Sequence, residues 1–290
     1  MHTKSGRMIR IVKMHGNGND FVIIDEFKGE LVPEKLKPDF VRAVCHRRFG
    51  VGGDGVIFVQ KSSIADAKFR YFNSDGSEAE MCGNGIRCFC RYIVEEGYAG
   101  EGVVRVETLV GIKELEVWFD GEWWIKVNMG KPKFGKDVPA REEVWGKIFS
   151  IDGMNFEVYA VNTGVPHAVI FVDDFNFDIV GVARRIRYHE VFPEGTNVNF
   201  AKVESRNRVF VRTYERGVED ETLSCGTGSC AVVVVGKTIG KLGDAVEVIT
   251  RGGILKIEVN DEIYMTGTAN RVFEGNLNLR ELRGYTFPMS

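Results

Sequence analysis

Glu78-Ala-Glu-Met-Cys82-Gly-Asn-Gly85 and Glu221-Thr-Leu-Ser-Cys225-Gly-Thr-Gly228 are two copies of one pattern, E-x-x-x-C-G-x-G. The strands predicted before them also match, Phe69–Asn73 against Val211–Glu215. Duplication of the cysteine, the glycines and the preceding strand predicts a chain folded as two similar halves, each with a thiol at the start of a helix. Two such thiols can take a proton from one side of a carbon and return one on the other side.

The chemistry of this motif follows from the helix predicted after it. The first backbone N–H groups of a helix have no partner within the helix and point outward with the positive end of its dipole. Such a terminus binds a carboxylate and lowers the pKa of a neighbouring thiol. A single cysteine beside a glycine turn is more often structural. Its duplication favours a reactive thiol at both Cys82 and Cys225.

Length and composition indicate a globular protein of two domains. The chain has 290 residues, of which 44% are hydrophobic and 27% charged. Glycine makes up 34 of the 290 residues, about 12% against a usual share of about 7%, and this excess predicts many tight turns. A net charge of −3 gives no electrostatic reason to expect nucleic acid or an acidic membrane as a partner.

The cysteines are expected to be thiols in a reducing cytoplasm. The segment Met1–Met8 lacks the apolar core of a signal peptide, and the longest aliphatic run, 231–235, is too short to span a membrane. The cysteine spacings match no common zinc pattern, so no metal is predicted. Four further cysteines lie in or beside predicted helices and are expected to pack as small hydrophobic residues: Cys45, Cys88, Cys90 and Cys230.

Residue patterns predict the secondary structure along most of the chain. Helices are expected over 37–49, 86–96, 179–188 and 229–242, with Gly97 as a C-terminal cap. The last helix is rich in valine, so burial must stabilise it against its low helix propensity. The segment 130–135 is a candidate linker. Strands are expected at 9–14, 21–24, 56–60, 68–72, 103–117, 123–129, 156–162, 168–171, 208–214, 245–249, 254–259 and 263–267.

Several polar segments allow two interpretations each. His15–Phe21 fits a type I′ hairpin turn or a ligand-facing loop equally well. Glu215-Arg216-Gly217 is either a solvated turn or a clamp for a zwitterion, since arginine suits a carboxylate. His167 is either a structural histidine or a ligand. The segment 193–199 is either a loop or the wall of a pocket.

Together these motifs resemble the diaminopimelate epimerase family, whose members epimerise an amino acid without a cofactor. The matching stretches occur in family order and cover nearly the whole chain: 14–21, 73–88, 166–167, 195–200, 214–217, 221–231 and 271–275.

The resemblance implies an α/β (α+β) fold of two pseudo-symmetric halves. Each half would be a mostly antiparallel sheet or barrel wrapped around a central helix, with the active site in the cleft between the halves. Residues 1–128 and 270–290 would form the half that carries Cys82, and 129–269 the half that carries Cys225. The resemblance also implies a homodimer.

The activity that the resemblance implies is interconversion of LL- and meso-diaminopimelate, in the pathway to lysine and peptidoglycan precursors. Cys82 would remove the α-proton of the LL isomer and Cys225 would deliver one from the opposite face, with no pyridoxal phosphate or metal. The α-carboxylate would lie on backbone N–H groups of Gly83, Asn84, Gly226 and Thr227.

Other side chains match family positions with supporting roles. His167 and Glu215 match residues thought to tune the thiols. The remaining positions match residues that hold the substrate, chiefly at its distal end: Asn19, Asn73, Asn197, Glu215 and Arg216.

The chain departs from the family pattern at three places. Val165 stands where many members have asparagine, Gly55 replaces a glutamine of some members, and the loop after Arg216 is one residue longer. These departures bear on substrate choice, so a racemase acting on lysine or a broader set of amino acids is the alternative enzyme. Asn84 argues against proline racemases, which typically have histidine there. A non-catalytic amino-acid binder or a redox switch that uses the two cysteines is the alternative from another class.

Overall fold

The computed structural model describes residues 8–282, and the chain divides into two compact units. Unit 1 comprises Met1–Lys126 and Thr268–Ser290, and unit 2 comprises Val127–Gly267. The chain leaves unit 1 within strand β8 (Glu122–Gly130) and returns within strand β17 (Ile263–Thr268). The predicted linker 130–135 therefore lies a few residues beyond the point where the units divide.

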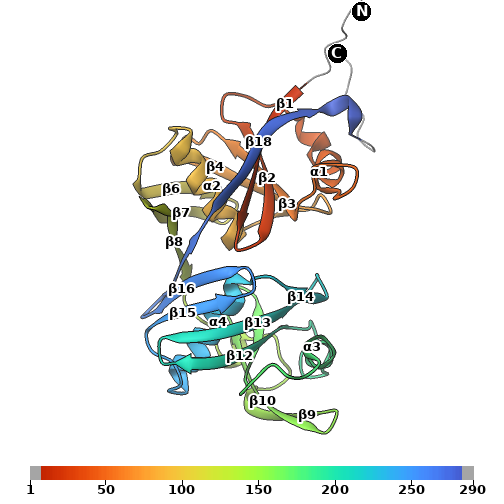
Figure 1. Ribbon diagram of the computed structural model, residues 1–290, viewed down its shortest axis with the longest axis vertical. Coiled ribbons are helices and arrows are strands. Elements are labelled where there is room, and N and C mark those ends of the chain that lie inside the picture. Colours follow the sequence, from red (N-terminus) through yellow and green to blue (C-terminus); the bar gives the residue numbers. More distant parts are fainter. Residues whose placement is uncertain (1–7, 283–290) are drawn as a thin grey trace, which may run out of the picture. The chain divides into compact units, whose positions relative to one another are not determined.

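Unit 1 contains a sheet in the spatial order β18-β1-β2-β3-β4-β6-β7. The pairs β2–β3 and β4–β6 are parallel and the others are antiparallel, and the short β5 pairs with β4. Figure 1 shows β18, from the end of the chain, lying along β1. The strands are β1 (Met8–Gly16), β2 (Asn19–Glu26), β3 (Gly55–Gln60), β4 (Ala67–Asn73), β5 (Glu78–Ala79), β6 (Gly102–Thr108), β7 (Gly111–Asp120) and β18 (Asn270–Asn278).

Unit 2 contains a sheet in the order β9-β10-β11-β12-β13-β15-β16-β17. Here β11–β12 and β13–β15 are the parallel pairs, and the short β14 pairs with β13. The strands that precede β17 are β9 (Trp145–Ile151), β10 (Met154–Asn162), β11 (Pro166–Phe171), β12 (Asn197–Ser205), β13 (Arg208–Glu215), β14 (Asp220–Thr222), β15 (Ala245–Thr250) and β16 (Gly253–Val259).

The two sheets repeat one pairing scheme. From β18 to β7 in unit 1 and from β9 to β16 in unit 2, the successive pairs are antiparallel, antiparallel, parallel, antiparallel, parallel and antiparallel. The predicted fold class, a mixed α/β fold built as two similar halves, is confirmed. Most pairs are antiparallel, as expected.

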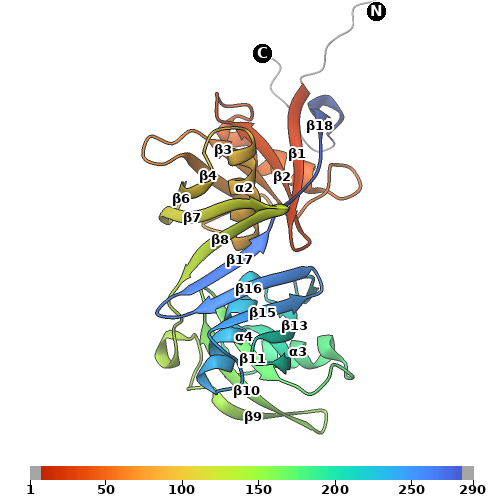
Figure 2. The same ribbon diagram turned by 60° about the vertical axis from the view of Figure 1, so that its left-hand side comes forward.

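One long helix in each unit is enclosed by the sheet. Helix α2 (Gly83–Glu95) contacts β1, β2, β3, β4 and β7, and Figure 2 shows it among these strands. Helix α4 (Gly226–Thr238) contacts the equivalent strands β10, β11, β12, β13 and β16. Its valines 232–235 are buried at 0–2% exposure, so burial stabilises a helix that propensity disfavours, as predicted.

Two shorter helices pack on the sheets. Helix α1 (Lys37–Cys45) packs on β3 and β4, and α3 (Ile179–Arg187) packs on β9, β12 and β13. Helix α1 ends four residues before its predicted end at 49. Gly50 N donates to His46 O, and a Cβ at Gly50 would lie 2.2 Å from Ala43 O. The chain therefore folds back against the end of the helix instead of continuing it.

Three other predictions need correction. The enclosed helices begin at Gly83 and Gly226, each three residues before the predicted start, because the G-x-G segments belong to the first helical turn. The predicted strand 103–117 is interrupted by a turn before Gly111, which has φ +100°. Strands β9 and β12 were not predicted, since polar residues obscure the alternation in both.

Two glycine turns adopt the predicted conformations. Asn17 and Gly18 have φ of 53° and 85°, and Gly16 pairs with Asn19, which makes the type I′ hairpin between β1 and β2. Gly97 has φ +76° and follows α2, where Tyr98 N donates to Ile93 O in a Schellman arrangement. His15–Phe21 therefore contains the predicted hairpin turn.

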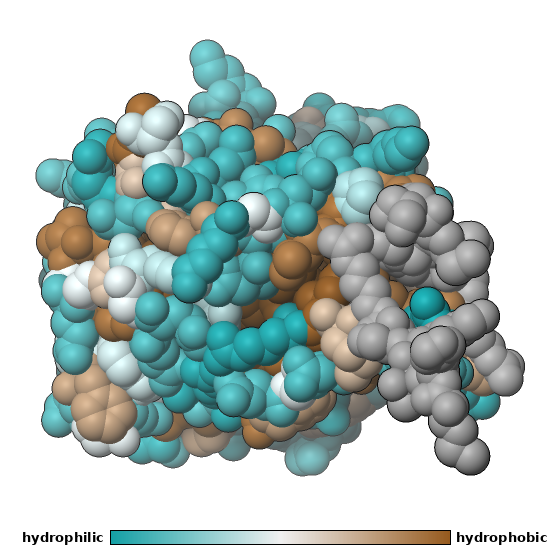
Figure 3. All heavy atoms as spheres, turned by 90° about the horizontal axis from the view of Figure 1, so that it is seen from above, coloured by the Kyte–Doolittle hydropathy of each residue, from teal (hydrophilic) through white to brown (hydrophobic). Residues whose placement is uncertain are grey.

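The described surface is largely polar. On the face shown in Figure 3, hydrophilic residues predominate and apolar areas lie between them. Within residues 8–282, no helix combines the length and apolar character needed to cross a membrane.

Replacing Gly97 by alanine is expected to destabilise unit 1 by about 1 kcal/mol, because a Cβ strains the left-handed conformation. Gly100→Ala is the matched control, since no atom lies within 4 Å of its Cβ position and its φ is not in that region. Urea unfolding would measure both free energies. Equal effects of the two substitutions would contradict the assignment.

Candidate active site

Both motif cysteines are N-caps of the enclosed helices. Cys82 precedes α2 and its Sγ accepts from Gly85 N at 3.4 Å, and Cys225 precedes α4 and accepts from Gly228 N at 3.4 Å. Both have extended backbone, with φ/ψ of −145°/116° and −122°/112°. The structure thus places each thiol at the positive end of a helix, where a thiolate is stabilised.

The last glycine of each motif makes room for the thiol and its neighbours. A Cβ at Gly85 would lie 3.3 Å from Cys82 Cβ, and a Cβ at Gly228 would lie 2.3 Å from Asn199 Oδ1. A side chain at position 228 would therefore displace Asn199. Close approach, and not a positive φ, explains these two glycines.

In unit 1 the thiol faces the side-chain amide of Asn19. Cys82 Sγ lies 3.7 Å from Asn19 Oδ1, which also accepts from Asn84 Nδ2 at 3.3 Å. Asn19 Nδ2 donates to Asp54 Oδ2 at 2.7 Å, and a carboxylate can only accept, so the amide orientation is fixed. Asn19 therefore presents an acceptor to Cys82.

A charged network holds Asp54 in place. Arg47 bridges Asp54 Oδ1 at 2.7 Å and Asp20 Oδ1 at 2.8 Å. Burial tends to raise the pKa of Asp20, but hydrogen bonds from Arg47 and Lys13 dominate and hold that pKa well below its usual range. Asp20 therefore stays ionised at neutral pH, and Arg47 joins it to the Asp54 carboxyl that holds Asn19.

In unit 2 the thiol faces a hydroxyl. Cys225 Sγ lies 3.4 Å from Thr227 Oγ1, and Thr227 Oγ1 lies 2.9 Å from His167 Nε2. Thr163 Oγ1 donates to Thr227 O at 2.8 Å and fixes the backbone there. His167, from β11, is completely buried behind this contact.

Two buried residues from neighbouring strands hold His167. Asn199 Nδ2, from β12, lies 3.1 Å from His167 Nδ1 and donates to Ala168 O at 3.0 Å. Thr213 Oγ1, from β13, donates to Asn199 Oδ1 at 2.9 Å. The buried histidine is therefore part of a continuous hydrogen-bonded chain that reaches the thiol.

Burial shifts the titration of both groups in this chain. Burial and, to a smaller extent, the charge of Arg216 lower the pKa of His167 to about 3. Burial also raises the pKa of the Cys225 thiol, as does the charge of Glu215, whereas Thr227 and Gly228 N–H act in the opposite direction. His167 is thus neutral, and Cys225 depends on local donors to form a thiolate.

The Glu215-Arg216 segment is anchored by Asn197. Asn197 Oδ1 accepts from Arg216 N at 2.8 Å, and its Nδ2 donates to Pro166 O at 3.0 Å. Arg216 Nη1 donates to Glu194 O at 3.2 Å, while Thr222 Oγ1 donates to Glu215. Backbone and side-chain contacts thus hold the acid and the base of this turn in place.

Asn73, at the end of β4, occupies the position in unit 1 that Glu215 occupies in unit 2. Asn73 Nδ2 donates to Ser77 Oγ at 3.0 Å, so its amide is held within its own turn. Of the two substituted family positions, Gly55 is sterically constrained, because a Cβ would lie 2.4 Å from both Phe72 O and the Tyr71 ring. Val165 is partly buried and its carbonyl accepts from Thr163 N at 3.2 Å.

Two buried side-chain oxygens lack a hydrogen-bond partner within residues 8–282: Asn84 Oδ1 and Ser224 Oγ. Asn84 follows Cys82 by two residues, and Ser224 directly precedes Cys225. Leaving a buried acceptor unsatisfied costs about 1–3 kcal/mol. Both unsatisfied atoms belong to residues that flank the motif cysteines in the sequence.

The other four cysteines lie within helices and not at an N-cap: Cys45 in α1, Cys88 and Cys90 in α2, and Cys230 in α4. All six are free, and burial raises the pKa of Cys45 and of Cys88 to about 12. Among the described residues, 8–282, no group of three or more His, Cys, Asp or Glu side chains is arranged to hold a metal ion.

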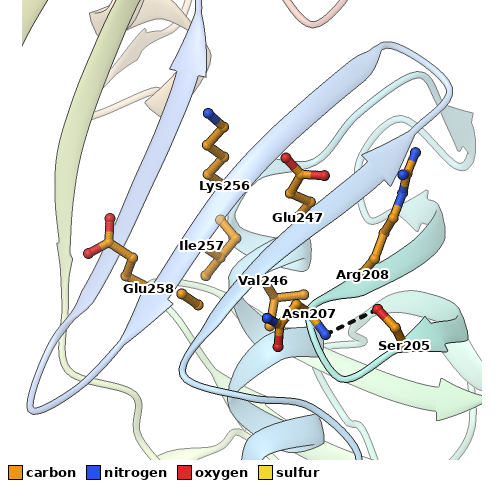
Figure 4. Close-up of a pocket in the computed structure, with 9 residues that line it drawn as sticks. Ser205, Asn207, Arg208, Val246, Glu247, Lys256, Ile257 and Glu258 are labelled. Carbon is orange, nitrogen blue, oxygen red and sulfur yellow. Dashed lines mark hydrogen bonds between the residues drawn. The ribbon is translucent and has the colours of Figure 1, made fainter.

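A hollow on unit 2 lies away from the thiol of that unit. It covers β13, β15 and β16, as Figure 4 shows, and its lining contains no cysteine or histidine. Arg208 pairs with Glu247 and Glu247 with Lys256, so charges of alternating sign cross these strands. This pattern is typical of a solvated sheet face.

Sequence reasoning did not single out Asp54, Asn199 and Thr213. Asn199 lies in the quoted stretch 195–200, two residues after Asn197, so strand alternation would have placed both on one face. Thr213 becomes visible only through its register with Asn199. Asp54 lies in the predicted turn 51–55, but its contact with Asn19 depends on the parallel pairing of β2 and β3.

The sequence matches a family profile described as diaminopimelate epimerase over residues 11–135 and 159–272. A protein named diaminopimelate epimerase from Archaeoglobus fulgidus is 65% identical over 277 residues, covering 95% of this chain and 98% of its own. One of the same name from Methanothrix thermoacetophila is 49% identical over 270 residues, covering 92% and 95%.

Solved structures share the fold at low identity. A phenazine biosynthesis protein of the PhzF family from Bacillus anthracis has a TM-score of 0.70 at 19% identity and covers 93% of this chain and 99% of its own. A hydroxyproline epimerase from Agrobacterium vitis has a TM-score of 0.65 at 19% identity, covering 99% and 97%.

His167→Gln is expected to change how stability depends on pH. The folded pKa of about 3 lies below the unfolded value of 6.5, so the contribution of neutral His167 to the free energy of unfolding is fully present above pH 6.5. It is lost by about 1.4 kcal/mol per pH unit as the pH falls toward 3. Urea unfolding from pH 7 to pH 4 should show the stability difference between wild type and His167→Gln shrinking. The surface variant His46→Gln is the control, and a constant difference for position 167 would refute the buried neutral state.

Proposed function

The chain belongs to the diaminopimelate epimerase family, and from that premise we propose that it interconverts LL- and meso-diaminopimelate by proton transfer between Cys82 and Cys225. It is accordingly an isomerase. The single observation that carries the two-thiol assignment is the matched cap geometry. Each cysteine is the N-cap of an enclosed helix, and its Sγ lies 3.4 Å from a glycine backbone nitrogen. The two thiols act on opposite faces of the same α-carbon.

Backbone N–H groups bind the α-carboxylate in this proposal. The first two N–H groups of each helix, at Gly83-Asn84 and Gly226-Thr227, have no acceptor within the helix. As the α-proton leaves, negative charge spreads onto the carboxylate, and donors fixed in advance stabilise that charge. The unsatisfied Ser224 Oγ can donate to a carboxylate, whereas the unsatisfied Asn84 Oδ1 can only accept.

The acid and base are one thiol and one thiolate. Cys82 removes the α-proton of the LL isomer while Cys225 donates its proton, and the roles reverse for the meso isomer. Because the two thiols share one proton, their ionisations are coupled and belong to the pair. His167 acts on Cys225 through Thr227, and the charge of Glu215 raises the pKa of the Cys225 thiol.

Five polar residues hold the substrate in this proposal, chiefly at its distal amino-acid group. Arg216 is the group suited to a carboxylate, and Asn197 fixes its backbone. Asn19 is held beside Cys82 by Asp54. The full set is Asn19, Asn73, Asn197, Glu215 and Arg216.

The proposed enzyme belongs to lysine biosynthesis and uses no cofactor. We also infer that it is cytoplasmic and a homodimer. The first inference is supported by six free cysteines, which suit a reducing compartment. The second is supported by the family alone.

Cys82→Ala and Cys225→Ala are each expected to lower kcat for epimerisation by about 10²–10⁴-fold, because each removes one of the two proton-transfer groups. Proton NMR in D2O, with reductant and LL- or meso-diaminopimelate, would follow loss of the α-proton and formation of the other isomer. Cys88→Ala is the control. It removes a buried thiol within α2, the helix that Cys82 caps, and should retain activity.

Each result of this experiment has a definite meaning. Exchange by the wild type together with near-normal turnover by either thiol variant would exclude the two-thiol mechanism. Equal turnover of lysine and diaminopimelate would favour a broad racemase. No exchange with any diamino acid would favour a binding protein.

A further inference from the structure

The hydrogen-bonded chain behind Cys225 has a fixed direction. We call Thr213, Asn199, His167 and Thr227 the relay. Ala168 O can only accept, so the Asn199 atom 3.0 Å from it is the Nδ2 donor, and Asn199 Oδ1 accepts from Thr213. The same Nδ2 lies 3.1 Å from His167 Nδ1, so Nδ1 is the unprotonated nitrogen of the neutral ring.

The direction continues to the thiol. With Nδ1 accepting, Nε2 of the neutral His167 carries the proton and donates to Thr227 Oγ1 at 2.9 Å. The hydroxyl, having accepted from His167, is free to point its own proton at Cys225 Sγ, 3.4 Å away. The relay thus donates in one direction, from Thr213 to Thr227, and its last donor is the Thr227 hydroxyl directed at Cys225 Sγ. A donor in that position suits a thiolate.

The relay is absent from the equivalent positions of unit 1. Asn199 pairs with Thr213 across β12 and β13 as Ile57 pairs with Tyr71 across β3 and β4. His167 pairs with Asn197 two positions before Asn199, as Phe21 pairs with Gly55 two positions before Ile57. Phe21 and Tyr71 instead pack edge to face, with ring centroids 5.7 Å apart.

Unit 1 presents the opposite chemistry to its thiol. Asn84 occupies the position of Thr227, and Asn19 Oδ1, whose orientation Asp54 fixes, is an acceptor 3.7 Å from Cys82 Sγ. The shared scaffold therefore supplies an acceptor to one thiol and a donor to the other.

We propose that Thr227 is a positioning residue whose hydroxyl proton the relay directs onto Cys225, stabilising its thiolate, and that His167 acts as a fixed Nε2–H donor and never as a base. This rests on the proposed function. The charged and titratable groups facing Cys225 and His167 are Glu215 and Arg216 at the end of β13 and Cys230 in α4. None of these donates to Thr227 Oγ1 in the described structure.

Thr227→Val keeps the shape and the backbone N–H but removes the donor. With the meso isomer, whose α-proton the Cys225 thiolate removes, we expect kcat/KM to fall about 10- to 100-fold, the loss of one hydrogen bond to a charged group. One limb of the pH profile of kcat/KM should move up by about one pH unit, because the Cys225 thiolate loses its donor. Thr227→Ser retains the hydroxyl and should restore both. An unchanged pH profile in Thr227→Val, at any level of activity, would overturn the proposal.

A second measurement needs no catalysis. The ¹⁵N shifts of His167, assigned by comparison with His167→Gln, should show the neutral Nε2–H tautomer from pH 5 to pH 9, and Asn199→Leu should release that preference. Protonation of His167 in this range, or the Nδ1–H tautomer, would overturn the relay. If the wild type fails to epimerise but the tautomer is as stated, the proposed function fails and the relay stands.

Discussion

A helix enclosed by a sheet can present only its ends to a ligand, and this constraint organises each unit. The sides of α4 contact β10, β11, β12, β13 and β16, and its valines are buried. The end with unsatisfied N–H groups is therefore the place where the helix can act on a bound anion. A cysteine as the N-cap brings a thiol to that point, and glycine three residues later lets the thiol and a strand side chain approach the first turn. The fold and the candidate site follow from the same packing.

Much of this arrangement could be predicted from the sequence because local residues determine it. The duplicated E-x-x-x-C-G-x-G pattern predicted two similar halves, and the Asn17-Gly18 turn and the Gly97 cap follow from residues that adopt positive φ. The prediction of the valine-rich helix succeeded because only burial reconciles that composition with a helix. Strand β12 escaped prediction, since Asn197 and Asn199 face the interior of unit 2, where a sequence pattern is expected to place apolar residues.

The groups that orient the thiols could not be predicted from sequence alone. Asp54 reaches Asn19 because β2 and β3 are parallel, and Asn199 reaches His167 because β11 and β12 are parallel. Such contacts depend on strand register, because a shift of one residue would move each side chain to the opposite face of the sheet. The thiol-tuning role of His167 and Glu215 was predicted through the family resemblance alone. The structure adds that His167 reaches Cys225 through Thr227, and that Asn199 holds the ring.

The comparison of the two units shows where a duplicated scaffold diverges. Pairing order, helix placement and cap geometry are the same in both, since all of them are needed to enclose a helix and expose its N-terminus. The side chains behind the thiols differ, with Phe21, Ile57 and Tyr71 in one unit and His167, Asn199 and Thr213 in the other. Burial raises the pKa of Cys225, so a thiol in that position needs donors that oppose the effect. A buried polar network is stable only when each of its members is satisfied, and the hydrogen bonds of the relay meet that condition while leaving one hydroxyl proton for sulfur. The two units therefore differ in the side chains behind the cysteines and not in the backbone scheme that encloses the helices.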